Sequence, residues 1–596
     1  MNRKLFFIFS ISVQTILKTS ARSEFSRQMN FGTHRSHLAF MAATRACARP
    51  WYASGKFMRG GSVASLGTRA TMTASAISPV AVNPALKFTS LPAVEITPSS
   101  QLPKEWRGEH LVVPVYVSKP DEENPEDSPS AELGTSALEI DAELDGAVRD
   151  LADQDLKAGA SITVHLGRGS PVRLLSVVGI DKDEVDYAGM GSTLAELATK
   201  NLKCSNMGVV MPTATVDPTK VDAFVQGMIG SMYSDNRYRT GTNIQKTPSL
   251  SAVHLLGCTD GSEDDVTEAV KRARGIMSGV SLCKDLVNAP ANVVTPQSMA
   301  QTAEDIAKEH GMEVEILEQS EVEAMGMGAY MGVAMGSLDP PKFIHLTYRA
   351  KQDGPVKKKM AIVGKGLTFD SGGYNLKAGA GSMIEMMKFD MGGSGVTLGT
   401  AKAIGMLQPA DLEVHFIIAA CENMISDRAM RPGDILTASN GKTIEVKNTD
   451  AEGRLTLADA LVFAENLEVD AIVDLATLTG ACIVALGNGY AGLFSGDDDL
   501  AKALEASGEE TKDLVWRMPM PASYDEQIKS KIADLQNIGG KGGGAITAAL
   551  FLKHFVKKTP WAHIDIAGPV WDDAKGGATG FGVRLMTDWL LKSRQL

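Results

Sequence analysis

The second half of this chain carries five short apolar runs that are separated by stretches with helical periodicity. The runs are FIHLTY (343–348), MAIVG (360–364), VHFIIAA (414–420), AIVDLA (471–476) and HIDIAG (563–568). Predominantly apolar runs of this length are typical of strands that are buried on both faces, as in parallel sheets covered by helices. Their alternation with helical patterns predicts an α/β fold with a mostly parallel central sheet flanked by helices.

A second, smaller α/β domain is expected before this region. Short β-type runs such as LVVPVYV (111–117) alternate with helical patterns at Ala137–Ala152 and Lys220–Met232. From Asp264 to about Leu286, apolar residues recur every three or four positions, which predicts a long amphipathic helix. We therefore predict a leader at 1–94, an N-terminal α/β domain at 95–262, a linker helix at 263–285 and a larger C-terminal domain at 286–596.

Two acids stand two residues apart in the octet NTDAEGRL (448–455), which a helical apolar pattern follows. In extended backbone, residues i and i+2 point the same way, so Asp450 and Glu452 can address one point beside Arg454. Such convergence suits a metal site or an acid/base pair. The octet alone also permits a helix-capping Asp450 with a surface Glu452.

A second group of charged residues follows the run MAIVG, which we expect to end as a strand at 364–366. Lys365, Asp370, Lys377 and Asp390 lie between residues 359 and 393, among many glycines. The carboxyl end of a buried strand is where open α/β sheets bind ligands, and glycine lets the backbone approach a ligand closely. The two lysines could alternatively be surface residues of a flexible loop.

Together these groups offer four carboxylates, at Asp370, Asp390, Asp450 and Glu452. A charge of about −4 cannot share one pocket unless cations enter it, and two divalent ions would neutralise it. Oxygen-rich sites suit Mg²⁺ and Mn²⁺, and Zn²⁺ also takes carboxylate ligands. None of the ten histidines lies in either group, and no HExxH motif occurs, which argues against a single-zinc metalloprotease. The sequence predicts a dinuclear site that activates water.

These motifs resemble those of the leucyl aminopeptidases, the cytosol aminopeptidase family of dinuclear metallo-exopeptidases. The octet is joined by GKGLTFDSGGYNLK (364–377), MKFDMGG (387–393), LVNAPANVVTP (286–296), DLATLTGA (474–481) and WAHIDIAGP (561–569). The resemblance extends over most of the chain after about residue 95, and the stretch 378–389 looks like the plant form. It implies a hydrolase that removes N-terminal residues, leucine and other apolar ones preferred, in peptide turnover.

The resemblance also implies a role for each charged residue. Two divalent ions (Mn²⁺, Zn²⁺ or Mg²⁺) would be held by Lys365, Asp370, Asp390, Asp450 and Glu452. Asp370 and Glu452 would bridge the ions, and Lys365 would ligate as a neutral amine. One ion would also take the free α-amine of the substrate.

The family further implies two catalytic residues outside the metal ligands. Lys377 would polarise the scissile carbonyl, and Arg454 would hold a bicarbonate ion or act through water. The first side chain of the substrate would lie beside Met387, Asn448, Thr477, Leu478 and Gly480. Family members form homohexamers, as dimers of trimers, so we expect the same assembly here.

The leader, residues 1–94, holds twelve Lys and Arg and one acid, Glu24, and is rich in Ser and Ala. Basic, acid-poor leaders of this kind are typical of organelle transit peptides. We expect the plastid stroma, with the mitochondrion or cytoplasm as alternatives, and either Met1 or Met41 as the start. A disordered tail is the other interpretation.

Charge and hydropathy limit the partners. Subtracting the leader's charge of +11 from the total of −12 leaves −23 for the body, which argues against nucleic acid. No stretch of about 18 apolar residues occurs, so we expect no membrane span. The six scattered cysteines form no CxxC pair, which indicates free thiols.

Two alternative functions stay open. One is a cysteinylglycine-type dipeptidase with the same site, and the other is a chaperone-like binding role.

Overall fold

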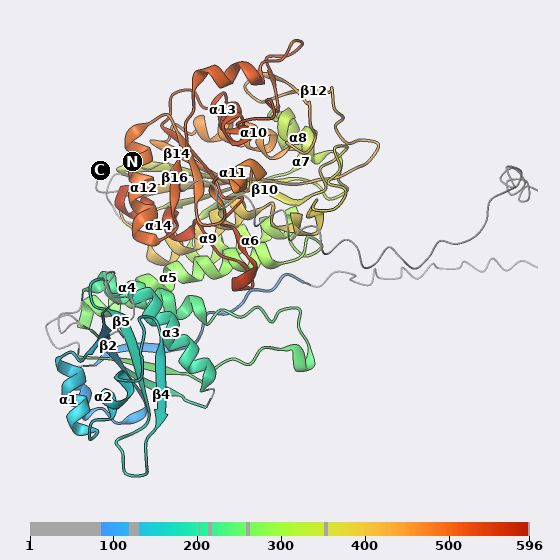
Figure 1. The fold of residues 1–596 in the computed structure, drawn as a ribbon. Coiled ribbons are helices and arrows are strands. Elements are labelled where there is room, and N and C mark those ends of the chain that lie inside the picture. Colours follow the sequence, from blue (N-terminus) through green and yellow to red (C-terminus); the bar gives the residue numbers. More distant parts are fainter. Residues whose placement is uncertain are drawn as a thin grey trace, which may run out of the picture. The chain divides into compact units, whose positions relative to one another are not determined.

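The computed structural model describes residues 85–99, 101–118, 130–201, 203–212, 217–257, 263–350 and 356–593. It has two α/β domains, each built on its own sheet (Figure 1). The leader before residue 85 lies outside the described residues. In the part of the chain that is described, no helix is long and apolar enough to cross a membrane.

The N-terminal domain contains a seven-stranded sheet in the order β1-β7-β6-β2-β5-β4, with β3 paired to β2. Its strands are β1 (Glu95–Ser99), β2 (Gly108–Val117), β3 (Ala131–Glu132), β4 (Ser161–His165), β5 (Val172–Asp181), β6 (Asn206–Val210) and β7 (Ala252–Leu256). The helices are α1 (Thr135–Glu143), α2 (Ala147–Ala152), α3 (Tyr187–Lys200) and α4 (Pro218–Ser231). All the β-type runs predicted for this domain are strands, and the run predicted at 220–232 is α4.

The single helix predicted at 137–152 is wrong, because the structure has two. The chain breaks between α1 and α2 at Asp145 and Gly146, whose φ angles are 52° and 86°. A left-handed backbone at two successive residues cannot continue a right-handed helix. The apolar periodicity survives the break, which is why the sequence pattern did not reveal it.

The C-terminal domain contains an eight-stranded sheet in the order β16-β15-β18-β14-β10-β11-β9-β8. Its strands are β8 (Glu313–Leu317), β9 (Lys342–Arg349), β10 (Lys358–Asp370), β11 (Leu412–Asn423), β14 (Ala471–Ala476), β15 (Ala491–Ser495), β16 (Val515–Arg517) and β18 (Trp561–Asp565). The central strands β11, β10, β14 and β18 are parallel, and antiparallel β9 and β15 flank them. The mostly parallel sheet predicted from the five apolar runs is therefore confirmed.

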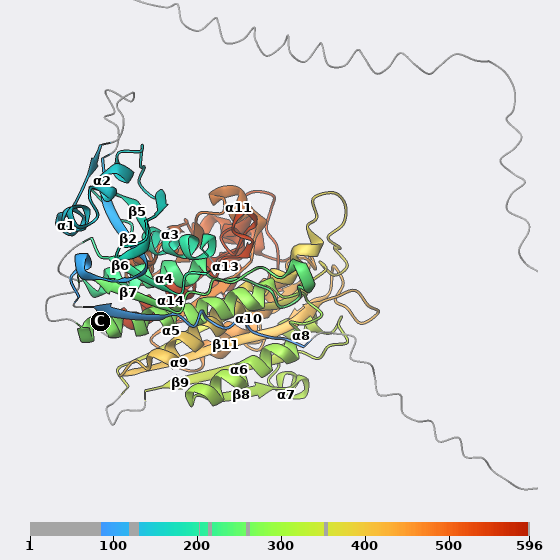
Figure 2. The same ribbon diagram turned by 90° about the horizontal axis from the view of Figure 1, so that it is seen from below.

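Helices cover both faces of this sheet. They are α6 (Pro296–His310), α7 (Gln319–Ala324), α8 (Gly328–Ala334), α9 (Gly392–Leu407), α10 (Gly453–Glu465), α11 (Gly480–Leu486), α12 (Asp498–Thr511), α13 (Gly544–Lys553) and α14 (Val583–Ser593). Figure 2 shows α6 and α9 lying along β9 and β11. Small strands complete the domain: β12 (Ile435–Thr437), β13 (Thr443–Glu445), β17 (Leu535–Gln536), β19 (Trp571–Asp572) and β20 (Gly577–Ala578).

The long helix α5 (Glu263–Asn288) occupies the residues of the predicted linker helix and extends to Asn288. It packs against α4 and α9. Its buried residues, such as Ala273 and Val280, belong to a core that also contains Phe224 and Val396 from the two domains. The helix therefore buries apolar residues against α4 of the N-terminal domain and against α9 of the C-terminal domain. The domain boundaries themselves remain a prediction.

Residues 85–94 fall inside the predicted leader, yet they lie against the body. The backbone N–H and the hydroxyl of Thr89 donate hydrogen bonds of 2.5 and 2.7 Å to the buried carboxylate of Asp285 on α5. Arg274 donates to the carbonyl oxygens of Pro92 and Val94. The packed chain therefore begins before residue 95.

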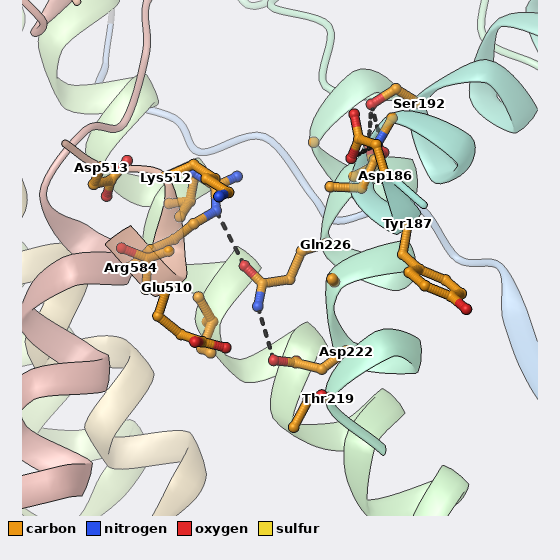
Figure 3. Close-up of a pocket in the computed structure, with 18 of the residues that line it drawn as sticks. Asp186, Tyr187, Ser192, Thr219, Asp222, Gln226, Glu510, Lys512, Asp513 and Arg584 are labelled. Atoms are coloured by element: carbon orange, nitrogen blue, oxygen red, sulfur yellow. Dashed lines mark hydrogen bonds between the residues drawn. The ribbon is translucent and has the colours of Figure 1, made fainter. Parts of the chain in front are cut away.

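A cavity of about 1990 Å³ is bordered by α3, α4, α5 and α14. At its edge, Gln226 donates to Asp222 (3.1 Å) and accepts from Arg584 (3.0 Å), as Figure 3 shows. Asp222 is 7% exposed, and within the described ranges its second carboxylate oxygen, Oδ1, has no hydrogen-bond partner. Burial, opposed by Arg272, raises the pKa of Asp222 from 3.8 to about 6.

This raised pKa predicts a pH-dependent effect of Asp222→Asn. Between pH 3.8 and about 6 the native state binds more protons than the unfolded state, so this group lowers stability as pH rises through that window. Asp222→Asn should raise the free energy of unfolding by at most about 3 kcal/mol at pH 8 and leave it unchanged near pH 4. Thermal unfolding at both pH values measures this, with Asp265→Asn on the exposed surface of α5 as control. A lower melting temperature of Asp222→Asn at pH 8 would contradict it.

Candidate metal centre

Four separate parts of the C-terminal domain supply the charged residues. Asp370 is the last residue of β10, and Asp390 follows the 3₁₀ helix Ile384–Phe389. Asp450 lies in a turn, and Glu452 is the residue before α10. The carboxyl ends of the parallel strands β10 and β14 meet at this edge of the sheet, which is where α/β folds bind ligands.

Three of the carboxylates converge on one point. One oxygen each from Asp370, Asp390 and Glu452 lies within 4.8 Å of the others, and all three residues are buried. Lys365 Nζ lies 2.7 Å from Asp390 and 3.0 Å from Glu452. Lys377 Nζ lies 2.8 Å from Asp370 and 2.5 Å from Asp450, so this lysine connects the fourth acid to the group. We call these six residues the carboxylate cluster.

Two details of the predicted backbone are corrected. The strand expected to end at 364–366 continues to Asp370, because β10 stays paired with the long neighbour β11 through a bulge near Leu367. Lys365 therefore projects from within a strand. Glu452 has helical backbone angles (φ −80°, ψ −36°) and not extended ones. A turn into a helix, and not strand alternation, brings Asp450 and Glu452 toward one place.

Glycines allow the elements to approach this closely. A Cβ on Gly393, at the start of α9, would lie 1.9 Å from the carbonyl oxygen of Leu475. A Cβ on Gly453 would lie 2.4 Å from the side chain of Lys365. A larger residue at position 393 would push α9 away from the sheet, and one at position 453 would displace the side chain of Lys365.

The four acids of the carboxylate cluster have too little positive charge beside them to neutralise them all. Burial, together with Glu452, raises the pKa of Asp370 to about 7, and burial raises the pKa of Asp390 well above its usual value. Burial opposes ionisation of Glu452, but Lys365 and Lys377 outweigh it and lower the pKa of Glu452. Burial also opposes the charge on Lys365, yet Asp390 and Glu452 raise its pKa. Two lysines thus leave part of the acid charge without compensation.

The cluster fits divalent cations. The oxygen Oε2 of Glu452 is buried and has no hydrogen-bond partner in the part of the chain that the structure describes, which is costly unless something else binds it. Carboxylate oxygens at this spacing are ligands that Mg²⁺, Mn²⁺ and Zn²⁺ accept. Lys365 can ligate only as a neutral amine, which requires the field of a neighbouring dication to reverse the raised pKa described above.

Arg454 lies in the first turn of α10 and is 6% exposed. Its Nη1 donates to the carbonyl oxygen of Asn537 (2.8 Å), whereas its Nε has no hydrogen-bond partner among the residues described. Burial lowers the pKa of Arg454 to about 10. A buried guanidinium with a free donor suits an anion such as bicarbonate.

The residues predicted beside the substrate differ in their contacts with the carboxylate cluster. The hydroxyl of Thr477 donates to Asp390 (2.8 Å), and its carbonyl accepts from Lys365 (3.1 Å). Asn448 accepts a hydrogen bond from the backbone of Asp450 (2.8 Å), and Met387 is partly buried in the 3₁₀ helix before Asp390. Leu478 is also partly buried, and exposed Gly480 begins α11 with open space around it.

Two buried asparagines were missed by the sequence analysis. Asn423, at the end of β11, donates to Asp370 (2.8 Å) and to the carbonyl of Thr449 (3.0 Å). The side-chain amide of Asn537 donates to the carbonyl of Asn448 (2.7 Å), and the backbone carbonyl of Asn537 accepts a hydrogen bond from Arg454. Asn423 could have been found as a polar residue closing an apolar run. No pattern marks Asn537.

The cysteines in the described part of the chain form no disulfide. Cys421, in β11, and Cys482, in α11, are both buried free thiols. Burial raises the pKa of Cys482 to about 12 and raises the pKa of Cys421 well above its usual value, so neither is a thiolate.

Comparison with known proteins agrees with this architecture. Residues 281–587 match the model of the cytosol aminopeptidase family, catalytic domain. A probable cytosol aminopeptidase from Cyanothece sp. (strain PCC 7425 / ATCC 29141) is 50% identical over 515 residues, which covers 84% of this chain and 100% of that protein. The chain belongs to the cytosol aminopeptidase family.

Further similarities support the same assignment of this aminopeptidase. A probable cytosol aminopeptidase from Gloeothece citriformis is 50% identical over 511 residues, covering 84% of this chain and all of that protein. The solved structure of a mutant of tomato leucine aminopeptidase superposes with a TM-score of 0.75 at 39% identity. It covers 85% of this chain and 98% of that chain, so the two-domain α/β fold is shared as a whole.

Proposed function

We propose that this aminopeptidase hydrolyses peptides with a free N-terminus by means of two divalent metal ions, and that it prefers leucine and other apolar first residues. The observation that carries the proposal is the convergence of three buried carboxylates within 4.8 Å, with Asp450 connected to them through Lys377. The residues that would hold the ions are Lys365, Asp370, Asp390, Asp450 and Glu452. Bound there, the ions would acidify a water molecule toward neutral pKa and so supply the nucleophile.

The protein's own side chains would carry the remaining tasks. Lys377 is only partly buried, and its raised pKa keeps it charged, so its Nζ would polarise the scissile carbonyl and then stabilise the oxyanion. Arg454 would hold bicarbonate, or a water molecule, at its free Nε and so assist transfer of the nucleophile's proton. Thr477 would keep Asp390 and Lys365 in place while Leu478 and Gly480 border the first side chain of the substrate.

Assembly and location remain proposals as well. We infer a homohexamer, which is supported by the exposed apolar side chains on and near α11, such as Val484 and Trp516. The basic leader supports delivery to a plastid.

The test is hydrolysis of leucine amide after chelation and again after each of Mn²⁺, Zn²⁺ and Mg²⁺ is restored. We expect no activity after chelation, recovery with metal, and no hydrolysis when the amine of the substrate is acetylated. Comparison with cysteinylglycine separates the dipeptidase alternative. Activity that ignores chelation, or that survives acetylation, is incompatible with the proposal.

A further inference from the structure

Asp565, the last residue of β18, is fully buried, and the loop after β14 occupies both of its carboxylate oxygens. Oδ1 accepts hydrogen bonds from the backbone N–H groups of Leu478 (3.2 Å) and Thr479 (3.4 Å). Oδ2 accepts from the hydroxyl of Thr479 (2.6 Å). Oδ1 also accepts from the N–H of Ala567 (3.2 Å), so four donors converge on one carboxylate.

The same loop touches the carboxylate cluster from its other side. Thr477 immediately precedes the residues that Asp565 holds, and it contacts Asp390 through its hydroxyl and Lys365 through its carbonyl. The hydroxyl of Thr479 also accepts from the N–H of Cys482 (3.0 Å) and thereby caps α11, which begins at Gly480. Residues 477–480 are thus fixed between the cluster and Asp565.

Asp565 is itself attached to a rigid base. The parallel strands β14 and β18 place Ala476 opposite Asp565 and Asp474 opposite His563. His563 Nδ1 lies 2.6 Å from Asp474, and the indole N–H of Trp561 donates to the same carboxylate (2.7 Å). All of these side chains are buried, so the end of β18 cannot move independently of β14.

We propose that Asp565 is a positioning residue that fixes the loop 477–480 and, through it, the selectivity of the enzyme for the first side chain of the substrate. The proposed effect on substrate selectivity rests on the peptidase function proposed above. The proposed effect on the conformation of the loop does not. Asp565 is not one of the proposed metal ligands, and its negative charge favours the charged form of Arg454 against the effect of burial on the Arg454 pKa. Its hold on the loop passes through the backbone of Leu478 and Thr479, the residues between Thr477 at the cluster and Gly480 at α11.

Three variants test the proposal. Asp565→Ala removes both carboxylate oxygens that accept hydrogen bonds from the loop. Asp565→Asn keeps Oδ1 for the backbone amides and turns an amide N–H toward the Thr479 hydroxyl, which can then accept. Asp474→Asn is the matched control, because it weakens the buried base of the same two strands without touching the loop.

Two readouts are needed. The first is kcat/KM for leucine amide against glycine amide in the metal-loaded enzyme. Asp565→Ala should lower the ratio of the two values by about 10- to 100-fold, as loss of a group that orients a site does, with Asp565→Asn close to wild type. The second is hydrogen exchange of the backbone amides of Leu478, Thr479 and Cys482. It should quicken at least about tenfold in Asp565→Ala and stay unchanged in Asp474→Asn.

The outcomes separate this proposal from the proposed function. If the wild type hydrolyses neither amide, the peptidase function fails, and the exchange rates still decide whether Asp565 holds the loop. Unchanged exchange in Asp565→Ala overturns the proposal. So does an equal loss for leucine and glycine amides that accompanies the same fall in melting temperature as in Asp474→Asn, because that pattern indicates only a structural role.

Discussion

Glu452→Ala is expected to abolish the peptidase activity. Its carboxylate lies 3.0 Å from Lys365 and within 4.8 Å of oxygens from Asp370 and Asp390, and its Oε2 has no hydrogen-bond partner among the described residues. Removing it takes away one of the proposed metal ligands, so we expect kcat for leucine amide to fall by at least about 10³-fold, the scale of losing a central charge-stabilising group. Bound metal should fall from two ions per subunit to one or none, measured by elemental analysis after dialysis.

The control for this variant is Glu385→Ala. Glu385 is exposed in the 3₁₀ helix that precedes Asp390, so its removal changes the net charge near the site without touching the cluster. Its activity and metal content should match the wild type. A Glu452→Ala enzyme that keeps a tenth of its activity would refute the assignment of Glu452, and it would favour a binding role that does not depend on catalysis.

Lys377→Met should lower kcat by about 10²- to 10³-fold while KM and metal content change little. Lys377 is the cation of the cluster that lies nearest to solvent, and its ammonium group bonds Asp370 and Asp450. If it stabilises an oxyanion that exists only in the transition state, its loss lowers kcat and kcat/KM together. Steady-state kinetics with leucine amide measure both constants.

Lys447→Met provides the comparison for Lys377. Lys447 is exposed beside Asn448 and pairs with Glu445 outside the cluster, so wild-type kinetics are expected. A rise in KM alone for Lys377→Met would mean that the lysine binds the ground state. Loss of metal instead would mean that it serves mainly as a counter-ion for the acids.

The fold was largely readable from the sequence where burial dominates. Largely apolar runs such as MAIVG and VHFIIAA became the central strands β10 and β11, because a strand buried on both faces has few positions that suit a polar side chain. The amphipathic repeat around Ala273 likewise became α5. Burial periodicity did not reveal the break at Asp145–Gly146 or the continuation of β10 to Asp370, which depend on backbone angles and on pairing with β11.

The candidate site was likewise only partly predictable from the sequence. Charged residues such as Asp370 and Glu452 stand out in a sequence, because buried carboxylates are costly and need a reason to be there. The neutral and supporting residues do not. Asn423, Asn537 and Asp565 hold the loops through backbone hydrogen bonds, and the partners of such bonds lie 26 to 89 positions away in the chain.

The central claim is that paired dications occupy the carboxylate cluster. Crystals of the protein soaked in manganese chloride and measured at the manganese absorption edge test it most directly. We expect two anomalous peaks per subunit, about 3.5–4 Å apart, among Asp370, Asp390, Asp450 and Glu452. Absence of any peak, with these four side chains turned apart toward solvent, would contradict the account.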